Sequence, residues 1–256
     1  MSQDSVHLEV SDHIALVRID RPPVNALDRA TRMRLISVFD QISEREDVRV
    51  AVLTGTGKYF CSGADLKDRP AKDQPGDFLA HNRATRETGN AIRECAKPVI
   101  AAVNGPALGA GFGLMAACDI YLASEDATFA MPEINVGLAG GVSMLRNLVG
   151  RSYTRRLFFT GMKVPAAELY RRGVLDAVVP GEQLMDEAMA VAREIAGKSP
   201  VAMGYAKMAA NMMDLMPQRD GYRFEQNFTM ALSRTEDAAE AMRAFFEKRP
   251  PVYKGR

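Results

Sequence analysis

The sequence predicts an α/β fold with a helical region at its C-terminal end. Short apolar segments rich in Val and Ala alternate with amphipathic segments through the first two-thirds of the 256-residue chain. Alternating strands and helices are typical of a parallel sheet that is covered by helices. From residue 182 on, the pattern is helical to the end. We therefore expect an α/β core over residues 1–197 and a helical region over residues 198–256.

The composition argues against several classes of protein. Lys and Arg number 33 against 32 Asp and Glu, so the net charge of +1 indicates no nucleic-acid partner. No apolar run approaches the roughly 18 residues of a membrane span, and residues 1–4 are polar, unlike a signal peptide. The cysteines are sparse, and no histidine stands at metal-ligand spacing. We expect no metal site and a cytoplasmic protein.

The first hundred residues predict a strand pair, a helix, a strand and a second helix. The turn between the paired strands falls at Ser11-Asp12, and Asp28 or Thr31 is the expected cap of the first helix. A polar segment with two prolines, residues 67–76, is expected to be a surface loop that contributes to the wall of a site. The expected ranges are 7–20 for the strand pair, 26–45 for the first helix, 48–54 for the strand and 78–95 for the second helix.

Residues 97–118 form the stretch around which the chain is organised. An apolar run at 99–103 predicts a buried strand, Asn104-Gly105-Pro106 ends it, and a Gly-rich segment at 109–113 begins a helix. A helix start presents unpaired N–H groups and a dipole that attracts negative charge. Because glycine lets a ligand approach the backbone, this turn could bind a phosphate, a carboxylate or a developing oxyanion.

The remaining elements continue the same alternation and then become helical throughout. Met and aromatic side chains near the end are expected to pack against the core or another subunit. The expected strands are 119–122, 127–130 and 174–179, and the expected helices are 142–149, 151–160, 166–172, 182–197, 200–216, 218–233 and 235–246.

Several known catalytic motifs are absent, and two small-residue turns remain. There is no GxSxG or GxxxxGK[ST] motif, and Leu114 stands where a dinucleotide fingerprint has its third glycine. The turns around Ala64 and Ala110 can each offer a backbone N–H. If these groups converge they form an oxyanion hole, which stabilises an enolate by a few kcal/mol; alternatively, the turn at residues 59–66 only joins a strand to a helix. Glu133 is the best candidate acid or base, although a carboxylate in the first turn of a helix has the same sequence signature.

At these residues the sequence resembles the crotonase family, the enoyl-CoA hydratase/isomerase superfamily. The resemblance covers essentially the whole chain and implies ββα units wound into a spiral. It also implies a C-terminal helical trimerisation region, often in a dimer of trimers. The expected ligand is an acyl-CoA thioester, so coenzyme A belongs to the substrate and no cofactor is permanently bound. The matching segments are FCSGADLK at 60–67, residues 97–119, Met131-Pro132-Glu133 and AFFEKRPPVYKG at 244–255.

The resemblance also assigns roles to single residues. The amides of Ala64 and Ala110 would form the oxyanion hole, and Glu133 would be the acid/base group. Leu27 would line the coenzyme A site. The adenine end would be bound by Ala64, Asp65 and Leu66, with Lys67 beside them and with Phe245 and Lys248 contributed by a neighbouring subunit.

One departure from the family pattern bears on the reaction. Hydratases with two carboxylates hold water between a glutamate early in the central helix and a second glutamate; the first position is Gly113 here, and the second is Glu133. A single carboxylate suits an isomerase, which moves a proton from C2 to C4. No acid stands at residues 137–141, where some members have an aspartate. The expected apolar surround of Glu133 is Phe112, Leu138 and Met144, which would raise its pKa.

Three readings therefore remain open. The first is an acyl-CoA isomerase or an atypical hydratase with Glu133 as its single acid/base group. The second is an acyl-CoA-binding protein with little catalysis. The third is a decarboxylase or thioester hydrolase that uses His81 or Glu87 from the helix at 78–95, although a solvated helix face also explains those two residues. The sequence defines neither the acyl chain nor the choice between trimer and hexamer.

Overall fold

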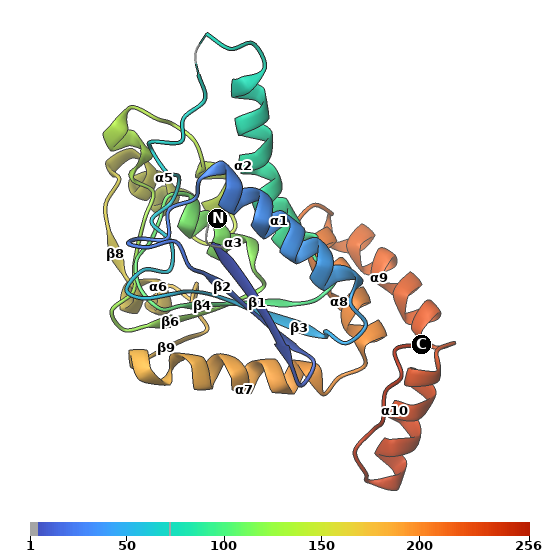
Figure 1. The fold of residues 1–256 in the computed structure, drawn as a ribbon. Helices are drawn as coiled ribbons and strands as arrows, with labels where there is room; N and C mark the ends of the chain where they lie inside the picture. The colour runs from blue at the N-terminus through green and yellow to red at the C-terminus, as the bar shows by residue number, and fades with distance from the viewer. Residues whose placement is uncertain (1–4, 72) are drawn as a thin grey trace.

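The computed structural model describes residues 5–71 and 73–256 and shows an α/β core from which a helical arm extends (Figure 1). The main sheet has six strands in the order β1-β2-β3-β4-β6-β9. Its first pair is antiparallel, and each later neighbour is parallel. The strands are β1 (Val6–Ser11), β2 (Ile14–Ile19), β3 (Val50–Gly55), β4 (Val99–Val103), β6 (Ile120–Ser124) and β9 (Ala177–Val179).

A second, three-stranded sheet has the order β5-β7-β8. The expected strand at 127–130 is β7, whereas the other two were not expected because each is only two residues long. So short a segment has no alternation that a sequence pattern could detect. The strands are β5 (Ala107–Leu108), β7 (Thr128–Ala130) and β8 (Val164–Pro165).

Helices cover both faces of the main sheet. Figure 1 shows α7 beneath the sheet and α1 and α2 above it, with α3 beside them. Asp28 is the N-cap of α1, where its side chain accepts a hydrogen bond from Thr31 N at 2.8 Å, so one of the two expected caps is confirmed. The core helices are α1 (Arg29–Glu44), α2 (Asp77–Arg93), α3 (Ala110–Ala117), α4 (Val142–Leu145), α5 (Arg151–Thr160), α6 (Ala166–Arg171) and α7 (Leu184–Ala196), with 3-10 helices η1 (Pro132–Val136) and η2 (Gly181–Gln183).

The central strands are apolar on both faces because both faces are covered. Ala51 and Leu53 of β3 face a cluster that includes Phe39 of α1 and Phe112 of α3. Val50 and Val52 face the opposite side, where they pack with apolar residues of α7. This arrangement explains why parallel strands have continuous apolar sequences instead of alternating ones.

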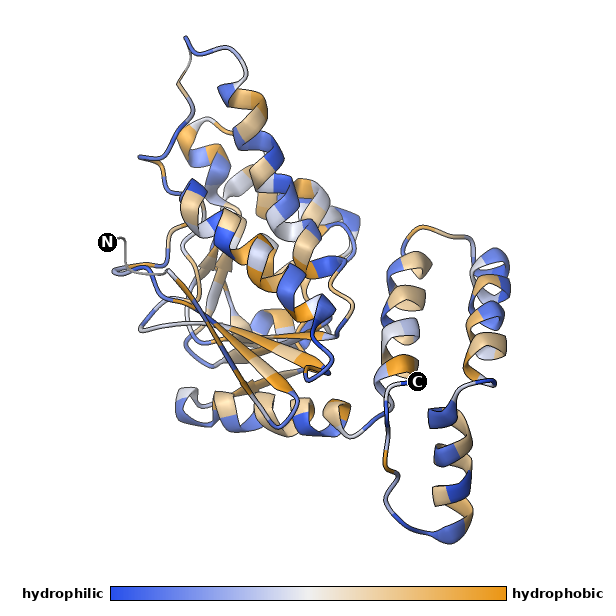
Figure 2. Cartoon of the chain, turned by 45° about the vertical axis from the view of Figure 1, so that its right-hand side comes forward, coloured by the Kyte–Doolittle hydropathy of each residue, from blue (hydrophilic) through white to orange (hydrophobic). Residues whose placement is uncertain are grey.

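The C-terminal helices α8 (Pro200–Met213), α9 (Gln218–Leu232) and α10 (Glu236–Glu247) form the arm. Figure 2 shows these helices standing beside the sheet core, with apolar residues on them. Lys207 on α8 ties the arm to the core through a 2.7 Å ion pair with Asp119. Phe245 and Phe246 on α10 are exposed in the single chain. Trimerisation through this region stays a prediction, as does the division at residue 197.

Two expected elements are shorter than the sequence predicts. The helix expected at 142–149 is the four-residue α4, after which the chain turns through Leu148 and Gly150 into α5. The strand expected at 174–179 is only β9, because Val174 and Leu175 are buried by packing without joining the ladder. Among residues 5–71 and 73–256, no helix is both long enough and apolar enough to cross a membrane.

Candidate active site

A pocket of about 310 Å³ brings together the three residues that the sequence singles out for catalysis, Ala64, Ala110 and Glu133. It lies between the N-terminal end of α3, the segment that follows η1, and the helices α1 and α2. The expected loop at 67–76 also contributes, through Arg69 and Pro70. The other lining residues are Arg32, Asp65, Leu66, Phe78, His81, Asn82, Thr85, Met131, Leu138, Ala139, Gly140, Gly141 and Met144.

Glu133 stands in the first turn of η1 and packs against the start of α3. Gly109 precedes α3 with a φ of +53°, a conformation that side chains rarely adopt. A Cβ atom at Gly109 would lie 2.6 Å from Glu133 Oε1. Glycine at this position therefore leaves the space that the carboxylate occupies, and the glycine-rich turn positions the candidate acid/base group.

The Glu133 carboxylate is partly desolvated, and hydrogen bonding compensates for this only in part. Its Oε2 atom is buried and has no hydrogen-bond partner among the described residues. Burial raises the pKa of this carboxyl above its usual value of 4.5, and a bond from its own backbone amide opposes the shift only in part. Leu138 and Met144 line the pocket beside it, as expected. Phe112 does not; its ring packs 5.3 Å from that of Phe129 in the core, so that part of the expected surround is wrong.

Two backbone segments place Ala64 next to Ala110. Leu108 N donates to Cys61 O at 2.9 Å, and a Cβ atom at Gly63 would lie 3.3 Å from Ala110 N, so the two turns are in contact. On the other side, Leu27 N donates to Gly63 O, and Asp65 N donates to Leu27 O. In a parallel pairing the intervening N–H, that of Ala64, points away from Leu27. The Ala110 amide is the first of α3 and has no acceptor within the helix.

Gly113 lies under Met144. A Cβ atom at Gly113 would approach Met144 Sδ to 2.5 Å. The space above the expected first-glutamate position is thus filled by a thioether side chain that can neither hold nor deprotonate a water molecule. The wall of the pocket that continues through Leu138 and Met144 is apolar here.

The expected coenzyme A residues fall into two groups. Ala64, Asp65 and Leu66 line the pocket, and Leu27 lies under them, fully buried and paired with Ala64. Asp65 accepts hydrogen bonds from Arg21 at 2.7 Å and from the amide of the exposed Lys67 at 2.9 Å. Within one chain, Phe245 and Lys248 belong to α10 and its C-terminal cap and do not line this pocket.

His81, which the sequence offers as a candidate of the decarboxylase or hydrolase alternative although a solvated helix face also explains it, lines the pocket. Its companion Glu87 is exposed and contacts Asn90. Arg32 was not singled out, although it falls three residues before Leu35 and seven before Phe39, on the buried stripe of α1. A cation on an apolar helical stripe is the signal that could have found it.

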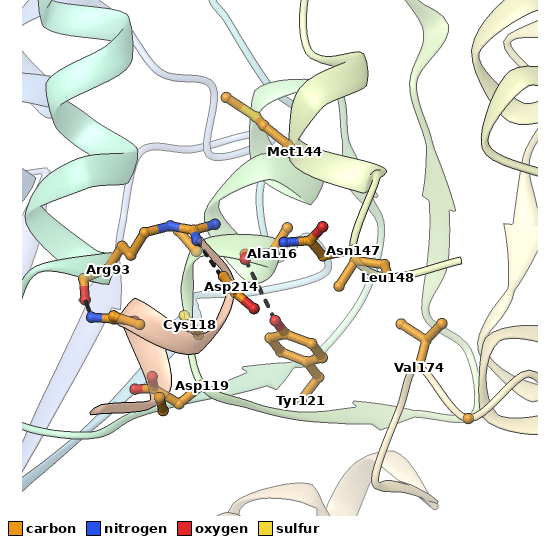
Figure 3. A pocket seen from close by; sticks show the side chains of 14 residues that line it. Arg93, Ala116, Cys118, Asp119, Tyr121, Met144, Asn147, Leu148, Val174 and Asp214 are labelled. Atoms are coloured by element: carbon orange, nitrogen blue, oxygen red, sulfur yellow. Dashed lines mark hydrogen bonds and ion pairs between the residues drawn. The ribbon is translucent and has the colours of Figure 1, made fainter. Parts of the chain in front are cut away.

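A second cavity of about 290 Å³ lies at the other end of α3, between the core and α8, and its polar groups are paired with one another (Figure 3). Arg93 contacts Asp214 at 3.4 Å, and the Tyr121 hydroxyl donates to Ala116 O at 3.4 Å. Burial raises the pKa of Tyr121, which keeps this hydroxyl neutral. The described part of the chain has no cluster of three or more His, Cys, Asp or Glu side chains that could ligate a metal ion.

Comparisons with known proteins agree with the α/β fold and identify relatives along nearly the whole chain. The curated relatives include a (7aS)-7a-methyl-1,5-dioxo-2,3,5,6,7,7a-hexahydro-1H-indene-carboxyl-CoA hydrolase from Mycobacterium tuberculosis, 38% identical over 92% of this chain and 95% of the relative. They also include a carnitinyl-CoA dehydratase from Salmonella enteritidis, 36% identical over 99% of both chains.

A crystal structure of an enoyl-CoA hydratase from Bacillus anthracis superposes with a TM-score of 0.93 at 33% identity, covering 98% of this chain and 100% of that one. The expected mixed α/β fold is therefore confirmed. The model of the family described as enoyl-CoA hydratase/isomerase matches residues 9–256. Nearly the whole chain takes part in these matches, and it belongs to the enoyl-CoA hydratase/isomerase family.

Proposed function

We propose that this enzyme acts on an acyl-CoA thioester by stabilising its enolate and moving one proton with Glu133. The observation that carries the proposal is the buried Oε2 atom of Glu133, which has no hydrogen-bond partner within residues 5–71 and 73–256 and lies in the pocket that Ala64 and Ala110 also line. The amides of those two alanines form the oxyanion hole, where the dipole of α3 adds to the attraction for negative charge. A raised pKa makes the carboxylate a stronger base than an exposed glutamate.

Double-bond isomerisation is the reaction that fits this chain best. The Glu133 carboxylate takes a proton from C2 of a 3-enoyl-CoA, and the negative charge that develops on the thioester oxygen is held by the two amides. The same carboxyl returns the proton at C4, so the double bond becomes conjugated to the thioester and no water is consumed. The position of Met144 over Gly113 supports this choice over hydration, because the thioether that occupies this place cannot deprotonate a water molecule.

The rest of the proposal concerns binding and assembly. Coenzyme A is part of the substrate, and no resident cofactor takes part. Asp65, Leu66 and Lys67 form the near side of its adenine site, above Leu27. The chain assembles as a homotrimer or a dimer of trimers, in which Phe245 and Lys248 of α10 reach the adenine and the phosphates of a neighbouring site. The exposure of Phe245 in the single chain supports that arrangement.

A hydrolase is the second candidate. Its support is the presence of His81 in the same pocket and the hydrolase named among the relatives. Burial lowers the pKa of His81, and the charge of Arg32 lowers it further. A neutral imidazole can accept a proton from water, so a thioester carbonyl held at the two amides could be attacked by that water.

The test is incubation with a 3-enoyl-CoA and, separately, with a 2-enoyl-CoA, followed by ultraviolet absorbance of the conjugated thioester. We expect conjugation to appear from the 3-enoyl substrate, and Glu133→Gln to reduce turnover by about 10²–10⁴-fold because the base is removed while the shape is kept. A Glu87→Gln variant, which changes a carboxylate of α2 that does not line the pocket, is the matched control.

Three other results would contradict isomerisation. Conversion of the 2-enoyl substrate to a hydroxyacyl-CoA, with loss of conjugation, would mean hydration, and release of free CoA thiol would mean hydrolysis. Binding of the thioester without any conversion would mean an acyl-CoA-binding protein.

A further inference from the structure

Arg32 is a buried cation in the wall of the candidate active site. Its exposed fraction is 2%, and it lines the pocket from α1. One hydrogen bond is made, from Nη1 to Thr85 Oγ1 at 3.2 Å, while Nε is buried without a partner among the described residues. Three buried side-chain atoms of the described residues have no partner, and two of them, Arg32 Nε and Glu133 Oε2, belong to this one pocket.

Among the described residues, no carboxylate contacts the guanidinium of Arg32 directly. It forms no ion pair with any residue that the structure describes, although Asp28 and Asp68 lie near enough to act on it through space. Asp28 pairs with Arg21 at 3.1 Å and caps α1, and Asp68 accepts from the amide of Arg29. A guanidinium stays charged in proteins, and a buried unpaired charge is strongly destabilising. The missing partner is therefore expected to come from a ligand.

The groups around Arg32 fit an anion with oxygen acceptors. His81, Asn82 and Thr85 of α2 line the same wall, so hydrogen-bonding side chains adjoin the cation. The carboxylate of Asp65, which also lines the pocket, is already engaged by Arg21 at 2.7 Å. Glu133 is the other carboxylate there, and its pKa is raised by burial with no offset from Arg32. The arginine and the glutamate thus act on different parts of a bound molecule.

We propose that the acyl group of the substrate carries its own carboxylate, which pairs with Arg32 while the thioester carbonyl lies at the amides of Ala64 and Ala110. The proposal rests on the proposed function, because it places an acyl-CoA in this pocket. It names the substrate class as thioesters of dicarboxylic acids. An arginine presents two parallel N–H donors, which match the two oxygens of a carboxylate. In the absence of that anion, the buried charge disfavours a purely apolar acyl chain.

The test compares glutaryl-CoA with valeryl-CoA by isothermal titration calorimetry. Both acyl groups have five carbons and are saturated, so they differ in the terminal carboxylate and offer no double bond to move. We expect the wild-type protein to bind glutaryl-CoA about tenfold more tightly or better, because hydrogen bonds to charged groups are the strong ones. In Arg32→Met this preference should disappear or reverse. Arg29→Met is the matched control, since it removes an exposed arginine of α1 that does not line the pocket, and it should keep the preference.

The results separate the two proposals. Equal affinities in the wild-type protein, or a preference that survives in Arg32→Met, would overturn the carboxylate assignment and leave the proposed function standing. Failure of both thioesters to bind would overturn both. The melting temperature of Arg32→Met should equal or exceed that of the wild type, because a buried unpaired charge is removed. If that variant does not fold, Arg32→Lys replaces it, and the wild-type ratio of affinities still decides the question.

Discussion

The two cavities at opposite ends of α3 differ in how their polar groups are satisfied. Around the cavity of Figure 3, Arg93 forms an ion pair with Asp214, and Asp119 forms one with Lys207. The Tyr121 hydroxyl donates to a backbone carbonyl. In the pocket at the N-terminal end, Glu133 Oε2 and Arg32 Nε have no partner among the described residues. Met144 lines both cavities. The cavities have similar volumes, so volume does not distinguish them.

We infer from this difference that the cavity of Figure 3 is structural and that the Glu133 pocket is the ligand site. Buried polar groups in folded proteins are almost always hydrogen-bonded, because an unmade bond costs the full desolvation of the group. A protein retains a buried polar group without a partner where a ligand supplies the missing hydrogen bond or where the group takes part in a reaction. Changes in the two cavities should therefore have opposite effects. In the N-terminal pocket they should remove activity with little loss of stability, and around the other cavity they should do the reverse.

Among the changes that test this contrast between the cavities, the largest effect is expected from Gly109→Ala. The added Cβ atom would lie 2.6 Å from Glu133 Oε1, on a backbone whose φ is positive, so the carboxylate must move. A displacement of about 1 Å in an active site lowers turnover by about 10²-fold. Steady-state kinetics on the 3-enoyl-CoA measures this loss.

Gly113→Ala is the matched control for that change. Its Cβ atom would meet the sulfur of Met144, the far end of a flexible side chain that can turn aside. We expect a smaller loss of turnover than in Gly109→Ala. An equal or larger loss would mean that the position of Gly113, and not the packing of Gly109 against Glu133, controls the chemistry.

The next effect is one of stability, in Lys207→Met. The Lys207 ammonium is buried at 3% exposure and contacts Asp119 at 2.7 Å and two backbone carbonyls at 3.4 Å. Its removal leaves the Asp119 carboxylate without its ion-pair partner, although the amide of Val99 still donates to it at 2.6 Å. A loss of about 2 kcal/mol is expected, less than for a fully buried pair because Asp119 keeps this bond and is 25% exposed. Urea unfolding measures the loss. Turnover per folded molecule should stay within about twofold of the wild type, since Lys207 does not line the Glu133 pocket and sites without shared partners act independently. A large fall in turnover would contradict the contrast between the cavities.

The sequence predicted most of the fold for reasons that are local. Apolar runs such as 99–103 are buried strands because both faces of a parallel sheet are covered, and the cap of α1 follows from Asp28. The glycine-rich turn and Glu133 could be found because their residue types carry chemistry. The two-residue strands could not, since tertiary contacts alone define them.

The sequence leaves the role of His81 open and misses Arg32, because the places of both residues in the pocket depend on distant packing. His81 has the sequence surroundings of a solvated helix residue, and only the approach of α2 to α1 places it in the pocket. Arg32 carried a usable signal, a cation on an apolar stripe, but its lack of a counterion is a property of several segments together. A buried polar atom without a hydrogen bond can be recognised only in the folded structure, because burial and partners both depend on segments that are distant in the sequence.

The smallest effect, and the most specific to the Glu133 pocket, is a shift in pH dependence. Burial raises the pKa of Glu133 above 4.5, and the base must be ionised to accept the C2 proton. Turnover should therefore fall as the pH drops through the raised pKa, at a higher pH than for an exposed glutamate. In terms of stability, the folded chain binds this proton more tightly than the unfolded chain, so the ionisation of Glu133 destabilises the fold as the pH rises through the same pKa. The pH profile of kcat/KM measures this acid limb, the range of pH over which turnover falls.

His81 is the group that could imitate this limb. Burial and the charge of Arg32 lower its pKa below 6.5, so its protonation falls in the same direction along the pH scale. His81→Gln removes that titration, and we expect the limb to keep its position because Glu133 causes it. If the acid limb of the profile vanished in His81→Gln, the titrating group would be the imidazole of His81, which would favour hydrolysis. A limb that stayed would tie the pH dependence to Glu133, whose carboxylate is the one ionisable group of the proposed isomerase that must be free of its proton at the start of each turnover.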